Sequence, residues 1–285
     1  MKGSARTLRM RTGAEWFWSA LLALLALAAA VGAKPVQAED IRIGGTGSAL
    51  ATMARLGEAY RKVQGDAQVV IVPNLGSSGG IRALLARAVD LAVVSRPLGD
   101  KERAAGATSQ VYGRTPFVFV TSRLTTGVSG VTLQQLIDIY SGTMTEWTDG
   151  TRVRLVLRPE ADSDTQVLRD ISPAFDRALT AAHQRPGLVT GATDHDSAAR
   201  VESHPGTLGS STLAFVRTED SSLKPLAVDG IEPSAQALVE GRYRWYKTME
   251  IVVAASTPPG ARRFVEFVRS PAGRELLVQL GHAVD

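Results

Sequence analysis

The apolar positions of residues 39–121 alternate between short runs and helical spacing. Three runs have the length of buried strands, namely 41–43, 68–72 and 90–94. After the first run, apolar positions recur every three or four residues from Leu50 to Tyr60, which predicts a helix with one buried face. Residues 81–88 predict a second helix. Strands that alternate with helices are typical of βαβ units in a parallel sheet.

A second series of elements follows the apolar strand 117–120. Thr132 can cap a helix that continues to Tyr140. Ser163 and Gln166 have the spacing of a capping box, which predicts the start of another helix. The remaining expected elements are strands at 153–157, 209–216 and 247–254, mixed helix and loop at 170–206, and an amphipathic helix at 262–280 that is broken near Pro271.

These elements predict an α/β fold with two lobes, each a mixed β-sheet flanked by helices. We expect strands 115–121 and 247–254 to cross between the lobes as two hinge strands. The first lobe would then be discontinuous, comprising residues 39–121 and 247–285. The second lobe, residues 122–246, would be an insertion in the first.

The first 38 residues have the organisation of a signal peptide. Basic residues from Lys2 to Arg11 precede the apolar run 16–31, and Ala38, with Val36 two residues earlier, fits cleavage near Ala38. The alternative is an uncleaved membrane anchor, but an apolar run of about 16 residues is shorter than the ~20 of a membrane span. A twin-arginine pair is absent from the sequence, which favours Sec export. We therefore expect a soluble, periplasmic protein.

The composition of the chain excludes several kinds of binding site. Of 32 basic and 28 acidic residues, five basic residues and one acid fall within 1–38, so the remainder holds 27 of each sign. A neutral body has no field that attracts nucleic acid. The sequence has no cysteine, which excludes disulfides and thiolate metal sites. Asp194-His195-Asp196 is rich in metal ligands, yet a solvated loop is the favoured interpretation, and we expect no metal and no cofactor.

Three turns rich in glycine and hydroxyl residues, at 44–50, 74–80 and 162–165, precede predicted helices. A helix N-terminus carries about half a positive charge and several unpaired N–H donors. Converging turns of this kind would hold an oxyanion, and Arg158 at the edge of the third turn would pair with it. A dinucleotide site is disfavoured because Leu50 stands where the motif G-x-G-x-x-G needs its third glycine.

Several segments resemble the Pst-type periplasmic phosphate-binding proteins of ABC transporters, along essentially the whole chain after residue 38. The most specific segment is Gly76-Ser77-Ser78-Gly79-Gly80, which is identical to the family's Gly-Ser-Ser-Gly-Gly. Similar segments lie at 45–50, 89–98, 139–147, 156–165, 206–209 and 228–234. The resemblance implies a periplasmic-binding-protein-like fold of two lobes that closes around a small anion.

The resemblance also implies which residues contact the anion. Ala49 and Leu50 would donate main-chain N–H groups, and Ser77 would donate its hydroxyl and its N–H. Arg158 would pair with the anion, while residues 163 and 165 would close the cradle from the second lobe. The complete expected set of ligand-binding residues is Ser48, Ala49, Leu50, Ser77, Ser78, Ser95, Arg158, Ser163, Asp164 and Thr165.

Some positions depart from the family pattern. Ala49 lacks the family's threonine hydroxyl, which the adjacent Ser48 would replace. Ser95 stands in place of the family's aspartate that accepts the proton of phosphate, which predicts weaker discrimination of phosphate from sulfate. Asp164 replaces a glycine, and it either supplies the lost acceptor or faces solvent at the helix N-terminus. Arg96 pairs with Asp164 or the ligand, or else is a structural charge at the rim.

The implied function is capture of phosphate, or a related oxyanion, for delivery to the membrane permease of an ABC importer. We expect a monomer that is not an enzyme and does not bind nucleic acid. One alternative is an oxyanion sensor or surface-binding protein of the same fold, and another is sulfate, molybdate or tungstate as ligand. Acid–base chemistry by Asp162 and Asp164, which flank Ser163, is a disfavoured alternative.

Overall fold

The structure is a computed structural model that describes residues 39–65, 67–219 and 221–284. The predicted signal peptide, residues 1–38, lies outside the described residues. Within the described part of the chain, no helix combines the length and the apolar character needed to cross a membrane. The described residues fold as a single unit that begins at Glu39.

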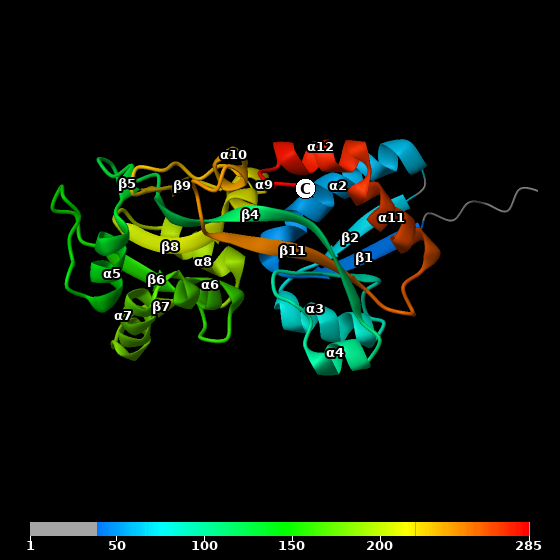
Figure 1. Cartoon of the computed structure of the whole chain (residues 1–285), viewed down its shortest axis with the longest axis horizontal. Coiled ribbons are helices and arrows are strands. Elements are labelled where there is room, and N and C mark those ends of the chain that lie inside the picture. The colour runs from blue at the N-terminus through cyan, green and yellow to red at the C-terminus, as the bar shows by residue number, and fades with distance from the viewer. Residues whose placement is uncertain (1–38, 66, 220, 285) are drawn as a thin grey trace, which may run out of the picture. The chain divides into compact units, whose positions relative to one another are not determined.

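Parallel βαβ units build the first part of the sheet, as Figure 1 shows in blue and cyan. Strand β1 pairs in parallel with β2 on one side and with β3 on the other. Helices α2 and α3 are the connections that the alternating pattern predicts. The bounds are β1 Glu39–Gly45, α2 Gly47–Gln64, β2 Ala67–Val72, α3 Gly76–Leu85, β3 Leu91–Val94 and α4 Asp100–Ala104.

Two antiparallel strands, β4 (Thr108–Ser122) and β11 (Tyr246–Val253), join the two parts of the sheet. Strand β4 pairs with β11 along residues 108–116 and with β8 (Thr207–Thr212) along residues 117–121. Strand β11 also pairs with β3. With β6 (Arg154–Leu157) and β7 (Val189–Thr190), the order is β2-β1-β3-β11-β4-β8-β6-β7. Both predicted crossing strands are therefore present, and they lie beside each other at the middle of the sheet.

The second part of the sheet contains β8, β6 and β7, which are parallel to one another. Short strand β9 pairs with β4, and β5 and β10 form a separate small sheet. The bounds are β5 Gly130–Val131, α5 Leu133–Ser141, β6 Arg154–Leu157, α6 Ser163–Ile171, α7 Pro173–Gln184, β7 Val189–Thr190, α8 Asp194–Glu202, β8 Thr207–Thr212, α9 Leu213–Thr218, β9 Leu223–Pro225, β10 Ala227–Val228 and α10 Ala235–Val239. Helices α11 (Pro259–Arg269) and α12 (Pro271–Gln279) follow β11, with the predicted break between them.

Separate apolar clusters support the two parts of the sheet. One cluster packs α2, α11 and α12 around Met53 and Phe264 beside β1. Another packs α5, α6 and α7 around Phe119, Tyr140 and Phe175. We call the elements around β1–β3 the first lobe and those around β6–β8 the second lobe. The exact boundaries 39–121 with 247–285 and 122–246 stay a prediction.

Two sequence-based assignments are wrong in detail. Helix α3 begins at Gly76 instead of Ile81, so most of the second glycine-rich turn is helical. Its small residues carry no apolar periodicity, which is why the pattern did not reveal it. Residues 213–216 belong to helix α9 instead of a strand, because the Thr212 side chain caps the helix by accepting from the Phe215 N–H.

The starts of two other helices also differ from expectation. Helix α6 begins at Ser163 as predicted, but its cap is Asp162, whose side chain accepts from the Asp164 N–H. The Gln166 side chain donates to Asp170 and forms no capping box. Asp194 lies in the first turn of α8, although the sequence favoured a solvated loop at that position.

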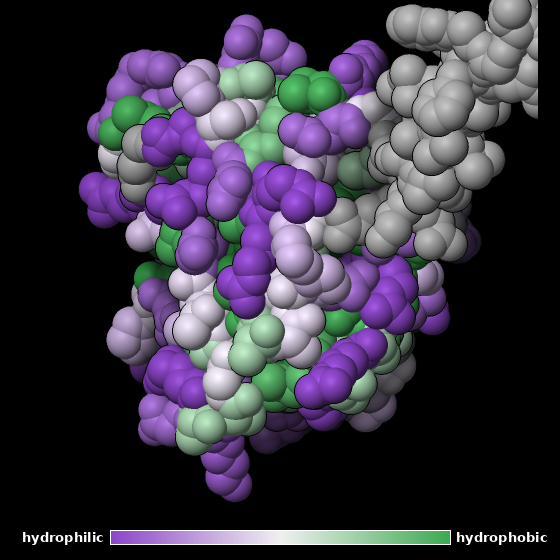
Figure 2. Space-filling view, turned by 90° about the vertical axis from the view of Figure 1, so that its right-hand side faces the viewer, coloured by the Kyte–Doolittle hydropathy of each residue, from purple (hydrophilic) through white to green (hydrophobic). Residues whose placement is uncertain are grey.

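Hydrophilic side chains are interspersed with hydrophobic ones and with residues of intermediate hydropathy on the face that Figure 2 presents. Exposed large apolar residues such as Val63 and Val278 are far apart in sequence and belong to different helices. Single exposed apolar residues of this kind are ordinary for a folded protein.

Candidate functional site

A cavity of about 340 Å³ is lined by turns from both lobes. Parts of all three glycine- and hydroxyl-rich turns contribute to its wall, together with the start of helix α8. A volume of this size suits a small ligand. The lining residues are Gly45, Thr46, Gly47, Asn74 to Gly79, Arg82, Arg96, Arg158, Pro159, Ala161 to Ser163 and Ala192 to His195.

The first turn lines the cavity chiefly with its main chain, and it contains one pair of neighbouring hydroxyl groups. Thr46 Oγ1 lies 3.0 Å from Ser48 Oγ, and both side chains are buried. The Ala49 N–H donates to the Thr46 carbonyl, while Ala49 and Leu50 belong to the apolar core of the first lobe. The cavity wall is therefore formed by residues 45–47, and the expected contacts Ser48, Ala49 and Leu50 lie behind it.

The second turn brings Ser77 and Ser78 to the cavity. Ser77 Oγ accepts a hydrogen bond from the Ser95 N–H at 3.2 Å. Ser95 Oγ in turn lies 3.0 Å from Ser163 Oγ, which connects strand β3 to the start of α6. Ser95 therefore links Ser77 in the first lobe to Ser163 in the second, through its main-chain N–H on one side and its hydroxyl on the other.

Arg96 lines the cavity and is held by a neighbouring carboxylate. Its guanidinium pairs with Glu102 at 2.7 Å and donates to Ser78 Oγ at 2.9 Å. The hydrogen bond from Arg96 holds the pKa of Glu102 down at about 2. Of the roles open from the sequence, a pairing of Arg96 with Asp164 is not observed, and a contact between Arg96 and the ligand stays a prediction.

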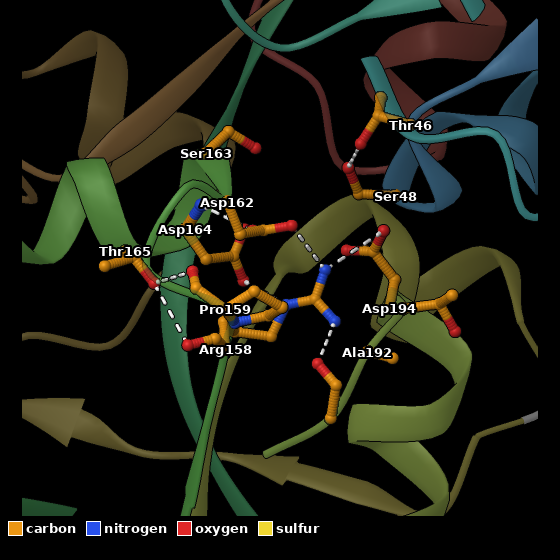
Figure 3. A network of polar contacts seen from close by, with 12 residues as sticks. Thr46, Ser48, Arg158, Pro159, Asp162, Ser163, Asp164, Thr165, Ala192 and Asp194 are labelled. Atoms are coloured by element: carbon orange, nitrogen blue, oxygen red, sulfur yellow. Dashed lines mark hydrogen bonds and ion pairs between the residues drawn. The ribbon is translucent and has the colours of Figure 1, made fainter. Parts of the chain in front are cut away.

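Arg158 lies at the end of β6 and is almost completely buried. Its Nη2 donates to Asp162 Oδ2 at 2.8 Å and its Nη1 donates to the Gly191 carbonyl at 3.0 Å (Figure 3). Its Nε has no hydrogen-bond partner among the described residues. Burial disfavours the charged guanidinium, but the nearby carboxylates outweigh burial and raise the pKa of Arg158.

Asp164 takes neither of the two positions that the sequence left open. Its carboxylate is buried, with Oδ1 2.5 Å from Lys247 Nζ and Oδ2 accepting from Ser210 Oγ at 3.0 Å. Asp164 does not belong to the cavity wall. Burial disfavours the carboxylate, but Lys247 and Arg158 overcome burial and lower the pKa of Asp164.

Lys247 is a polar residue of this region that sequence reasoning missed. It lies on β11, is buried, and donates to Ser163 Oγ at 2.8 Å as well as to Asp164. Burial would lower the pKa of Lys247, but Asp164 and the other carboxylates raise it. The only signal in the sequence is a lone lysine beside the apolar run of a predicted crossing strand.

Thr165 and Asp194 complete the second-lobe side. Thr165 is fully buried, and its hydroxyl donates to the Pro159 carbonyl at 2.8 Å, so it fixes the loop behind the cavity. Asp194 lines the cavity, with Oδ2 3.8 Å from Arg158 Nη2. Its neighbour Asp196 pairs with Arg200 and accepts from the Ala192 N–H. The described residues contain no group of three metal-ligating side chains.

The charged side chains immediately around Arg158 do not balance. The carboxylates of residues 162, 164 and 194 face the cations of residues 158 and 247. Burial, followed by the neighbouring Asp164 carboxylate, raises the pKa of Asp162. Because carboxylates outnumber cations around Arg158, the second-lobe wall would attract an anion through Arg158 and local hydrogen-bond donors rather than through a net positive charge.

Known proteins share this architecture. A family model for the PBP superfamily domain matches residues 30–272, and the chain therefore belongs to the PBP superfamily. The phosphate-binding protein PstS of Borreliella burgdorferi is 20% identical over 249 residues, which cover 85% of this chain and 88% of that protein.

Two solved structures show the same two-lobed α/β fold. The Clostridium perfringens substrate-binding protein assigned to phosphate ABC transport, with bound phosphate, superposes with a TM-score of 0.73 at 19% identity, covering 87% of this chain and all of that one. The phosphate-binding protein PfluDING, a periplasmic protein bound with phosphate, gives a TM-score of 0.65 at 13% identity, covering 86% of this chain and 90% of that one. The predicted fold class is thus confirmed.

Proposed function

We propose that this protein binds inorganic phosphate in the cavity between its lobes and delivers it to the membrane permease of an ABC importer. The observation that carries the proposal is buried Arg158 beside a cavity lined by hydroxyl groups and helix starts from both lobes. The PstS protein that the chain resembles and the two phosphate-bound structures support the same ligand.

The binding mode follows from the donors that line the cavity. Helices α2, α3 and α6 all begin at its wall, and each contributes the positive end of its dipole and unpaired N–H groups. Ser77, Ser78 and Ser163 add neutral hydroxyl donors, while Arg158 adds the charge. Dipolar donors bind an oxyanion without requiring a net positive lobe. Of the expected ligand-binding residues, we keep these four as direct contacts and give the others a supporting role.

The delivery route completes the proposal. Cleavage near Ala38 would release residues 39–285 into the periplasm as a monomeric carrier. Its two lobes, 39–121 with 247–285 and 122–246, would close on phosphate by movement about β4 and β11. Closure would remove water from the cavity and present both lobes to the permease. A carrier of this kind performs no chemistry on its ligand.

Calorimetric titration of the purified protein with phosphate tests the function. The expected result is binding of one phosphate per chain with a dissociation constant in the micromolar range or below, as befits a scavenging carrier. Titration with molybdate and tungstate determines whether a larger oxyanion is preferred. Absence of heat with every oxyanion, in protein whose folding is verified by circular dichroism, would contradict the proposal.

A further inference from the structure

Lys247 connects a crossing strand to the wall of the cavity. It lies on β11 opposite Thr115 of β4, close to the residues at which β4 changes its partner from β11 to β8. Its side chain is 1% exposed, and Nζ donates to Ser163 Oγ at 2.8 Å and to Asp164 Oδ1 at 2.5 Å. Ser163 lines the cavity, whereas Lys247 and Asp164 do not. Lys247 therefore reaches the cavity wall through Ser163.

The contact with Lys247 determines how the Ser163 hydroxyl can be used. An ammonium group has three donors and no acceptor, so Ser163 Oγ accepts from Lys247. The single hydrogen of the hydroxyl then points away from Lys247, toward Ser95 Oγ at 3.0 Å or toward the cavity. In Figure 3 the Ser163 hydroxyl points to the side on which Thr46 and Ser48 lie. An anion in the cavity would provide an acceptor for this hydrogen.

Asp164 holds the ammonium group in place. Its carboxylate accepts from Lys247 and, at 3.0 Å, from Ser210 Oγ. Burial would lower the pKa of Lys247, but Asp164 and the other carboxylates raise it, so the ammonium group stays charged at neutral pH. Because Lys247 is bound to a buried counter-ion, it is a donor of fixed position behind the cavity wall.

The contribution of Lys247 differs from that of the arginines on the cavity wall. Arg158 lies on the second-lobe side, and Arg82 and Arg96 lie on the first-lobe side. These side chains can face an anion directly, whereas Lys247 acts on a neutral hydroxyl group. A hydroxyl that accepts from a cation is a stronger donor, because each hydrogen bond in a chain polarises the next one. Lys247 would thus strengthen the bond from Ser163 to an anion.

We infer that Lys247 is a positioning residue of the anion site, which orients the Ser163 hydroxyl and strengthens it as a donor to the bound anion. The inference rests on the proposed function and adds to it a residue of the crossing strand β11. It assigns to Lys247 a contribution to phosphate affinity that disappears when the Ser163 hydroxyl is absent. A lysine that only stabilised the fold would show no such dependence on Ser163.

Calorimetric titration with phosphate tests the inference in variants that keep the net charge of the protein. Lys247→Met/Asp164→Asn removes one cation and one anion together, so a loss of affinity does not arise from a change in net charge. Phosphate affinity should fall about tenfold, because the Ser163 hydrogen bond loses its charged partner. The same two substitutions added to Ser163→Ala should change the affinity of Ser163→Ala by less than about twofold.

Arg42→Met/Asp90→Asn is the matched control for the loss of an ion pair. Arg42 Nη2 lies 2.9 Å from Asp90 Oδ1, and neither residue lines the cavity. This variant also keeps the net charge, and it should bind phosphate like the wild-type protein. Circular dichroism and a melting curve verify that each variant is folded. Lys247→Met/Asp164→Leu, which replaces the buried pair by apolar side chains, is the second variant to measure if the first does not fold.

Three results would overturn the inference. One is wild-type phosphate affinity in a folded variant that lacks the Lys247 ammonium group. Another is an equal loss with and without the Ser163 hydroxyl, which would show that Lys247 does not act through Ser163. The third is a comparable loss in the Arg42 control. In all three cases phosphate binding by the wild-type protein would still support the proposed function, whereas absence of that binding would contradict both.

Discussion

The two walls of the cavity carry different kinds of polar group. The first-lobe wall consists of glycine, serine and threonine at the starts of α2 and α3, and its arginines are exposed at Arg82 or paired at Arg96. The second-lobe wall carries Arg158, Asp162 and Asp194, with Lys247 directly behind it. Neutral donors can hold any small anion, whereas a fixed arrangement of charges can discriminate among anions. Substitutions in the second-lobe wall should therefore change stability and anion binding more than substitutions in the first-lobe wall.

Lys247→Met should cause the largest loss of stability. It leaves the Asp164 carboxylate buried without its cation, which costs about 3–5 kcal/mol of unfolding free energy. Urea denaturation measures this loss. Adding Asp164→Asn should restore much of it, and Lys101→Met on the exposed helix α4 should change little. A loss below about 1 kcal/mol for Lys247→Met would contradict the role given to the pair.

His282 tests whether the interior of the first lobe, in contrast to that of the second, excludes charged side chains. It is fully buried, with Nε2 3.3 Å from Thr52 Oγ1, and burial lowers its pKa from 6.5 to about 3. Its folded pKa is below the unfolded value, so its contribution to stability is complete above pH 6.5 and declines as the pH falls toward 3. The expected slope is about 1.4 kcal/mol per pH unit.

Unfolding free energies measured between pH 7 and pH 4 check this expectation. His282→Gln should remove the slope that His282 contributes, while the same substitution at the exposed His204 should leave it in place. A wild-type and His282→Gln profile that are parallel throughout this range would show that His282 is not held in its neutral form.

Ser77→Ala should have the smallest of these effects. It removes one neutral donor from the first-lobe wall, which corresponds to about 1 kcal/mol, or a several-fold weaker phosphate affinity. Phosphate titration measures this change, and Ser141→Ala at the exposed end of α5 is the control. If Ser77→Ala weakened phosphate affinity as much as the removal of the Arg158 charge is expected to, the two walls would not differ in the way described.

The sequence predicts most of the fold because its strands and helices are locally encoded. The alternation of apolar runs and helical spacing predicts the units β1-α2-β2 and α3-β3, and the Thr132 cap predicts the start of α5. A local pattern can predict the wrong element where the same residues suit both a helix and a strand. Residues 213–216 are apolar enough for a strand, yet they form α9 because a preceding threonine caps them.

The site is less predictable because its charges come from distant elements. Arg158 and the serine-rich turns are recognisable, since each lies next to a helix start in the sequence. Lys247 contacts residues more than eighty positions away, and no local pattern connects it to α6. Asp194 stands beside His195 and Asp196, which suggests a metal site or a loop until the fold brings it to Arg158.

Phosphate titration of Arg158→Ala tests the central claim most directly, because Arg158 is the buried cation on which the second-lobe wall is built. The variant should retain its circular dichroism spectrum and lose at least about a hundredfold in phosphate affinity, as expected when a charged hydrogen-bonding partner is removed. Arg154→Ala, an exposed arginine on the same strand, should bind phosphate like the wild-type protein. Phosphate affinity within a few-fold of wild type for folded Arg158→Ala would contradict the account.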